Sequence, residues 1–215
     1  TASTGGTDTV YSTLASYTLG ANVENGRILA TGTANLTGNS LNNVLYAGAG
    51  NNVLDGSSGT DTASYAYATA GVTVSLVVTG AQATGGSGSD TLVAIENLTG
   101  SKYADTLTGN AAANVLDGGA GIDTMVGGDG SDTYYVRDVG DTVTETNATA
   151  STGGTDTVYG TLASYTLGAN VENGRILATG TANLTGNSLN NVLYAGAGNN
   201  VLDGSTGTDT ASYAY

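Results

Sequence analysis

The sequence of 215 residues contains no cysteine, no proline and no histidine, and neither Phe nor Trp. Without cysteine, no disulfide can hold the chain together. Without histidine, the usual general base of enzymes, the Ser–His and Cys–His nucleophile systems and imidazole zinc sites are all excluded. No apolar run approaches the length that a membrane-spanning helix needs.

Basic residues are almost absent as well. Four residues (Arg27, Lys102, Arg137 and Arg175) face 18 acidic ones, which gives a net charge of −14. Nucleic acids and anionic membranes need Lys and Arg to neutralise their phosphates, so we expect no nucleic-acid partner and no membrane insertion. An excess of carboxylates suits a divalent cation, although it also serves solubility.

What is abundant is glycine, with 35 residues, together with Thr, Ser, Asn, Ala and Val, while 13 Tyr supply all the aromatic side chains. Gly, Asn, Thr and Val lower helix propensity, and β-branched residues favour strands. The composition therefore predicts many short strands joined by tight turns.

The chain repeats itself over a long distance. Residues 1–67 recur as 149–215, and the two copies differ only by Ser12 against Gly160 and Ser58 against Thr206. We therefore expect one full tandem unit over 1–148 and the start of a near-identical unit over 149–215, in one continuous solenoid. The chain begins and stops within the pattern, so we expect it to be an excerpt of a longer array.

A shorter repeat of nine residues runs inside the long one. The stretch GGAGIDTMVGGDGSDTYY, residues 118–135, is one phrase written twice, with aspartate sixth (Asp123 and Asp132) and an apolar residue eighth (Met125 and Tyr134). The phrase also occupies 100–108, 109–117, 136–144, 38–64 in three copies, and the second copy of 38–64 from residue 186.

Two such phrases can form one flattened coil of 18 residues, in the order turn, strand, turn, strand. Stacked coils pair each strand in parallel with the strand 18 residues later, and the eighth-place side chains meet inside. The fold prediction is therefore all-β, a parallel β-roll or β-helix solenoid with 18-residue coils. Sixth-place residues then stack along two edges, with Asp105, Asp123 and Asp141 in one column and Asn114 and Asp132 in the other.

Some coils should be irregular. Six-residue inserts at 94–99 and 145–150 break the period and predict bulged or bent coils. In residues 65–84, the alternation of Val72, Val74, Leu76 and Val78 predicts a longer half-buried strand.

Stacked carboxylates need a cation between them. Two carboxylates ~5 Å apart repel by roughly 3–4 kcal/mol at an effective dielectric near 20. Carboxylates and glycine-turn carbonyls are hard oxygen ligands, and a ring of carbonyls suits Ca²⁺ better than the strictly octahedral Mg²⁺. The pattern thus predicts several bound calcium ions.

The phrase GGxGxDxUx in GGSGSDTLV (85–93) and in residues 118–135 resembles the nonapeptide of RTX (haemolysin-type) calcium-binding repeats. The resemblance implies a parallel β-roll that holds Ca²⁺ between turns, and export by a type I exporter of Gram-negative bacteria. We expect folding to be coupled to calcium binding outside the cell. The candidate metal-site residues are Asp105, Asp123, Asp132, Asp141, Asp90, Asp61, Asp209, Asp8, Asp156, Gly119, Gly121, Gly128 and Gly130.

These candidates are not equal. We expect the strongest sites around Asp105, Asp123, Asp132 and Asp141, and weak or empty sites at 38–55 and 186–203, where Asn takes the sixth place. For Asp8, Asp61, Asp90, Asp156 and Asp209, a solvated surface turn stays an alternative. Four glutamates lie outside the nine-residue register, and for them we favour solvated turns over metal ligands: Glu24, Glu96, Glu145 and Glu172. For the tyrosines we favour coil caps and core fillers: Tyr17, Tyr65, Tyr67, Tyr134 and Tyr135.

The hypothesis for function is a calcium-stabilised structural segment of a large secreted adhesin or extracellular filament at the cell surface, possessing no enzyme activity. Neighbouring copies in a fibre are possible partners. The alternative is the C-terminal calcium module of a secreted enzyme such as a protease, lipase or epimerase. Glycosidase chemistry is disfavoured because the paired carboxylates follow the repeat and no Trp platform accompanies them, and an ice-binding face is disfavoured because the register breaks too often.

Overall fold

The computed structural model describes residues 5–147 and 153–213, and within them every regular element is a β-strand. No helix among these residues is long and apolar enough to cross a membrane. One sheet of 11 parallel strands runs the whole length of the molecule. Its strands are, in spatial order, β1 (Thr9–Ser12), β3 (Asn25–Ile28), β5 (Val44–Tyr46), β7 (Thr62–Ser64), β11 (Asn97–Thr99), β13 (Val115–Asp117), β15 (Thr133–Val136), β17 (Thr157–Gly160), β19 (Asn173–Ile176), β21 (Val192–Tyr194) and β23 (Thr210–Ser212).

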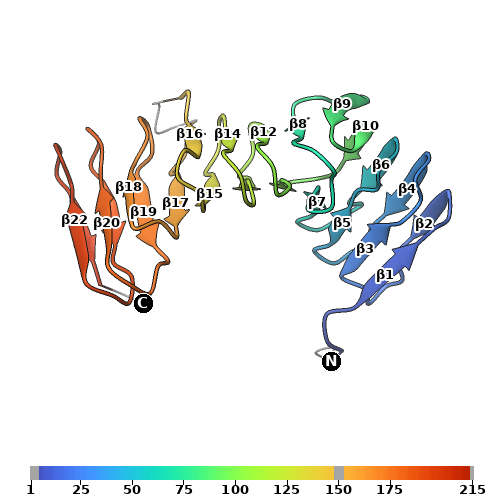
Figure 1. The fold of residues 1–215 in the computed structure, drawn as a ribbon, viewed down its shortest axis with the longest axis horizontal. Helices are drawn as coiled ribbons and strands as arrows, with labels where there is room; N and C mark the ends of the chain where they lie inside the picture. Colours follow the sequence, from blue (N-terminus) through green and yellow to red (C-terminus); the bar gives the residue numbers. More distant parts are fainter. Residues whose placement is uncertain (1–4, 148–152, 214–215) are drawn as a thin grey trace.

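The opposite face is divided into three sheets. The first contains β2 (Ser16–Thr18), β4 (Ala34–Thr37), β6 (Asn52–Asp55), β10 (Gly88–Val93) and β9 (Gln82–Gly85); the second β16 (Thr142–Thr144), β14 (Thr124–Val126), β12 (Thr106–Thr108) and β8 (Thr73–Ser75); the third β18 (Ser164–Thr166), β20 (Ala182–Thr185) and β22 (Asn200–Asp203). The molecule is an arch, with β1 and β2 in one arm and β20 and β22 in the other (Figure 1).

The register of the regular coils follows the predicted period. Thr106 pairs with Thr124 and Thr124 with Thr142, and on the other face Val115 pairs with Thr133. Each step is 18 residues, and the strands run parallel. The prediction of a β-solenoid with 18-residue coils is confirmed.

The first irregular coil is more complex than a bulge. β7 pairs with β11, 35 residues later in register, and the chain between them forms β8, β9 and β10 on the opposite face. β9 is antiparallel to β10, and an antiparallel bridge joins Val72 to Gly85. The side chain of Gln82 extends this contact, because its Oε1 accepts from the Ser75 N–H at 2.8 Å and its Nε2 donates to the Ser75 carbonyl at 2.9 Å.

One expectation for this region is wrong in detail. The predicted long strand is only the short β8, which contains the buried Val74; Val72 is buried directly before it, and Val78 lies in a solvent-exposed connection to β9. The segment 94–99 ends the predicted irregular coil, and there Leu98 is fully buried and β11 belongs to the continuous sheet. Tertiary pairing thus decides which residues of the alternating run become strand.

The second irregular coil joins the two tandem units. β15 pairs with β17, and Thr133 lies opposite Thr157, a step of 24 residues. The predicted insert 145–150 falls here, but residues 148–150, like the expected unit boundary between 148 and 149, lie outside the described residues.

The core is a single row of side chains between the two faces. The eighth-place residues of consecutive half-coils are all fully buried: Leu98, Leu107, Leu116, Met125 and Tyr134. Such a thin core depends on the coils above and below it.

The tyrosines divide between core and surface. Tyr65 and Tyr134 are core fillers, as predicted, and Tyr17 packs against the core. Tyr67 is half exposed and lies under the Arg27 guanidinium, while Tyr135 stacks on Tyr159 at 5.4 Å between ring centroids. Tyr67 is therefore not one of the core fillers.

Candidate calcium sites

One column of acidic and amide side chains follows the continuous sheet from end to end. It consists of the residue directly before each strand of that sheet, and we call it the carboxylate ladder: Asp8, Glu24, Asn43, Asp61, Glu96, Asn114, Asp132, Asp156, Glu172, Asn191 and Asp209. Glu24, Glu96 and Glu172 occupy the same structural place as the sixth-place aspartates. These three lie outside the nine-residue register of the sequence, as expected, but the structure nevertheless places them in the ladder.

Hydrogen bonds between coils hold the ladder. The backbone N–H of one rung donates to a carboxylate oxygen of the next: Asn114 to Asp132 and Asp132 to Asp156, both at 2.7 Å. Where the next rung is a glutamate, its Oε2 accepts the same bond. Asp61 donates to Glu96 at 2.7 Å.

A second column stands on the opposite face, before β12, β14 and β16. It contains Asp105, Asp123 and Asp141, as the spacing predicts. The N–H of Asp105 donates to Asp123 Oδ1 at 2.9 Å, and the N–H of Asp123 donates to Asp141 Oδ1 at 3.0 Å. Asp90 occupies the equivalent place in β10, where its Oδ1 accepts the Asn52 N–H at 2.8 Å.

The second carboxylate oxygens separate the predicted sites into two groups. The Oδ2 atoms of Asp61, Asp90, Asp123 and Asp132 are buried without any hydrogen-bond partner, in side chains that are 0–1% exposed. Such an atom costs free energy unless a cation or a donor meets it. Unpartnered oxygens therefore mark these four positions as the sharpest candidates for a cation.

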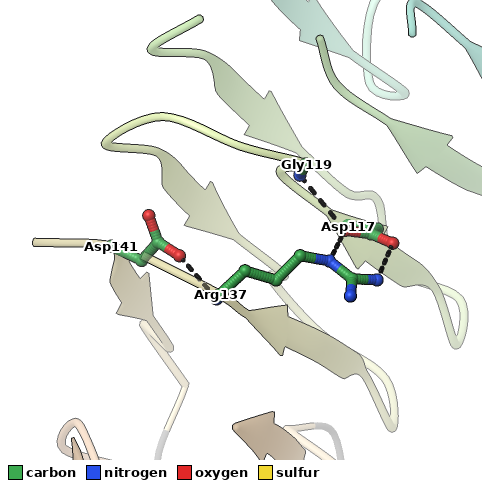
Figure 2. Close-up of polar contacts among 4 residues, drawn as sticks. All are labelled: Asp117, Gly119, Arg137 and Asp141. Carbon is green, nitrogen blue, oxygen red and sulfur yellow. Dashed lines mark hydrogen bonds and ion pairs between the residues drawn. The ribbon is translucent and has the colours of Figure 1, made fainter. Parts of the chain in front are cut away.

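Asp105 and Asp141 differ, because protein donors reach both of their oxygens. The N–H of Arg137 donates to Asp141 Oδ2 at 2.9 Å, and that of Ser101 donates to Asp105 Oδ2 (Figure 2 shows the Asp141 contact). Asp156 is buried, with its Oδ1 bonded to the ladder, whereas Asp8 and Asp209 are exposed. The predicted residues thus lie in the two columns, but they differ in whether a carboxylate oxygen is left without a hydrogen bond from the protein.

Basic side chains do not neutralise the columns. The one ion pair among the described residues joins Arg137 to Asp117 at 2.6 Å, and Asp117 Oδ1 also accepts the Gly119 N–H at 3.1 Å (Figure 2). Asp117 is a ninth-place residue at the end of β13, away from the ladder position. Among the described residues, no basic side chain is therefore paired with a carboxylate of either column.

Burial changes the acidity of these carboxyls. Desolvation raises the pKa of Asp90 to about 7, and it raises the pKa of Asp132 to about 6. The pKa of Asp123 also rises to about 6, first by desolvation and then by the charges of Asp105 and Asp141. Each shift means that the folded chain resists the negative charge.

Glycines bring the turns of neighbouring coils together. Gly119, Gly121, Gly128 and Gly130 have φ of 92°, 126°, 109° and 108°, as predicted for positive-φ turns. A Cβ at Gly130 would lie 2.6 Å from the carbonyl oxygen of Ala112 in the coil before. Turn carbonyls and carboxylates therefore converge, and this all-oxygen donor set fits Ca²⁺.

The asparagine rungs satisfy themselves within the protein. Asn114 Nδ2 donates to the Glu96 carbonyl at 2.7 Å, while its Oδ1 accepts the Asn110 N–H at 2.7 Å. Asn43 and Asn191 repeat this arrangement on Glu24 and Glu172. Asparagine therefore joins neighbouring coils by hydrogen bonds from its amide to backbone carbonyls.

One trio of carboxyls combines two ladder rungs with a glutamate from outside the repeat pattern. Asp132, Glu145 and Asp156 each offer an oxygen, and these oxygens lie within 4.8 Å of one another. Glu145 is only 5% exposed, and the Tyr134 hydroxyl donates to its Oε1. Desolvation raises the pKa of Glu145 to about 8 and that of Asp156 to about 7. The expectation of a solvated turn is wrong for Glu145.

Stacked parallel coils with carboxylates at every turn define a cation-binding β-solenoid. Comparison with protein families finds the RTX calcium-binding nonapeptide repeat in four copies, at residues 31–63, 95–125, 108–143 and 179–211. The matches cover more than half of the chain, which belongs to this family as a calcium-binding structural repeat region. Comparison with curated proteins gives no match.

Proposed function

We propose that this chain is a calcium-dependent structural segment of a secreted bacterial surface protein, an adhesin or an extracellular filament, and that it folds when it meets calcium outside the cell. The observation that carries the proposal is the set of buried, unpartnered carboxylate oxygens of Asp61, Asp90, Asp123 and Asp132. A calcium ion bound by these oxygens compensates their negative charge and takes the place of the missing hydrogen-bond donors.

The chain's own residues prepare each site. The backbone N–H of the preceding coil holds Oδ1 of the aspartate, as Asp105 does for Asp123, and leaves Oδ2 directed to the turn. Positive-φ glycines such as Gly121 bring the turn carbonyls close. In the absence of calcium the columns repel themselves, so an acidic, glycine-rich chain of this kind stays disordered until calcium is present.

The role we assign to the long tandem repeat is to extend the solenoid. The first unit, 1–148, and the second, from 149, stack as one solenoid in our proposal, which the pairing of β15 with β17 across the unit boundary supports. Each further unit then lengthens the same array. Self-association of neighbouring copies in a fibre and type I export belong to the same proposal.

Circular dichroism of the whole chain with calcium and with EDTA tests the proposal. We expect the β signal in calcium and its loss in EDTA, with recovery when calcium is restored in excess. Magnesium at the same concentration is the matched control, and we expect it to restore much less signal. A β signal that is indifferent to both chelation and calcium would refute the calcium account.

A further inference from the structure

We propose that Asp132, Glu145 and Asp156 form a calcium site of a second kind, which joins one tandem unit to the next. The inference rests on the proposed function, because it takes calcium as the ion that the chain meets. It adds a ligand, Glu145, that the nine-residue repeat does not supply.

The geometry of the trio is that of a prepared site. Its three carboxyl groups offer oxygens within 4.8 Å of one another, and the side chains are 1%, 5% and 1% exposed. Asp132 Oδ2 and Glu145 Oε2 are buried and have no hydrogen-bond partner. Two neighbouring carboxyls on two different segments thus each keep one buried oxygen without a partner.

Neighbouring residues leave space for the trio and orient it. A Cβ at Gly127 would lie 2.6 Å from Glu145 Oε1 and would also contact Asp132 Oδ2 and the Tyr134 hydroxyl. Tyr134 donates its hydroxyl proton to Glu145 Oε1, and the N–H of Asp132 donates to Asp156 Oδ1. Glu145 Oε2 and Asp132 Oδ2 are the atoms that remain free to coordinate.

The site is not a copy of the repeat sites. Consecutive rungs of a regular coil are 18 residues apart, whereas Asp132 and Asp156 are 24 apart. Glu145 directly follows β16, on the opposite face, and enters the interior from there. The longer connection of this coil therefore brings a third carboxyl, that of Glu145, next to two successive rungs of the ladder.

No basic side chain offsets the three charges. Arg137 is paired with Asp117, and the other three basic residues lie over tyrosine rings: Arg27, Lys102 and Arg175. Carboxylate oxygens are ligands that Ca²⁺ accepts in flexible geometry, together with carbonyls and water. Mg²⁺ dehydrates reluctantly, so a buried all-carboxylate site favours calcium.

The position of the site gives it a role at the unit junction. Asp132 and Glu145 belong to the first unit, and Asp156 is the eighth residue of the second. Asp8, the counterpart of Asp156 in the first unit, is exposed because β1 is an edge strand of the continuous sheet. The aspartate at this position of the unit is therefore buried only where the last coil of a preceding unit covers it. Each junction between units of an array would then hold one such ion.

Equilibrium dialysis with radioactive calcium tests the site on the full chain. We expect Glu145→Gln and Asp156→Asn each to lower the number of tightly bound ions by one, and the double variant to lower it by the same one. Asp203→Asn, in an exposed side chain, is the matched control and should leave the number unchanged.

An unchanged number in both single variants, or a loss of two ions in the double variant, would overturn the site. If the unsubstituted chain bound no calcium, the proposed function would fail first, so the two failures are distinct. A second measurement needs no variant: in crystals of the chain grown with Tb³⁺, anomalous density between the three carboxyls supports the site, and density only at other turns refutes it.

Discussion

Replacing Asp123 with asparagine is expected to change stability in opposite directions with and without calcium. Asp123 is fully buried, its Oδ1 accepts the Asp105 N–H, and its Oδ2 has no partner. The amide of asparagine carries no charge, and Asn114 shows that such an amide fits the ladder, where its Oδ1 accepts the Asn110 N–H of its own turn. The substitution therefore removes the buried charge while conserving the shape of the side chain.

The magnitude without calcium follows from the acidity of this carboxyl. Its pKa rises from 3.8 to about 6 in the folded chain. At about 1.4 kcal/mol for each tenfold change, ionisation at neutral pH costs the folded state roughly 3 kcal/mol. Water at the turn screens part of this cost, so we expect Asp123→Asn to stabilise the calcium-free chain by about 2 kcal/mol.

With calcium the sign reverses. An ion present at 100 times its dissociation constant stabilises the fold by about 2.7 kcal/mol, and a neutral amide weakens that binding. We expect Asp123→Asn to lower the unfolding free energy in calcium by about 1–3 kcal/mol. Urea unfolding in calcium measures the loss, and the residual β signal in EDTA measures the gain, both followed by circular dichroism. A residual β signal in EDTA that the substitution does not increase would refute the reasoning.

Three further predictions concern the turns, the core and pH. Gly130→Ala should destabilise by about 1–3 kcal/mol, because it places a Cβ at positive φ against a backbone carbonyl. Gly160→Ala, where a Cβ meets open space, should be near neutral, and equal urea midpoints for the two variants would contradict this. Leu116→Ala should cost about 2–5 kcal/mol, measured in calcium, because Leu116 is fully buried in a core one side chain thick. In calcium-free buffer the stability should fall as pH rises from about 4 to 8. Carboxyls whose pKa is raised in the folded state, such as Asp90 (about 7) and Glu145 (about 8), bind protons more tightly folded than unfolded. A residual β signal in EDTA that rises with pH would contradict this reasoning.

The nine-residue period predicts most of the fold because it specifies strand, turn and register together. It places Asp123 and Asp141 in one column and Met125 in the core, and the structure shows both. It does not reveal Glu24 and Glu96 as ladder rungs, because they arrive after steps of 16 and 35 residues. The signal that could have found them is local: each is followed by asparagine and then by a strand of the same sheet.

The remaining differences depend on contacts that the repeat does not encode. The alternation around Val74 fits a long strand as well as a short one, and the antiparallel pairing of β9 with β10 decides between them. Glu145 is buried because the 24-residue coil closes over Tyr134, which no period of nine can indicate. Similarly, the unpartnered oxygens become visible only when every donor near them is known.

The division of one face into three sheets has a mechanical consequence. Between β16 and β18 no strand pairing joins neighbouring coils in the described residues, so at this point the continuous sheet, through β15 and β17, supplies all the strand pairing. A second break separates the sheet of β10 from that of β8 and β12. In a solenoid each coil contacts only its neighbours, so a pulling force acts on every junction between coils in turn. A pulled chain would therefore separate first at one of these two breaks, and the calcium concentration around it would set the force required.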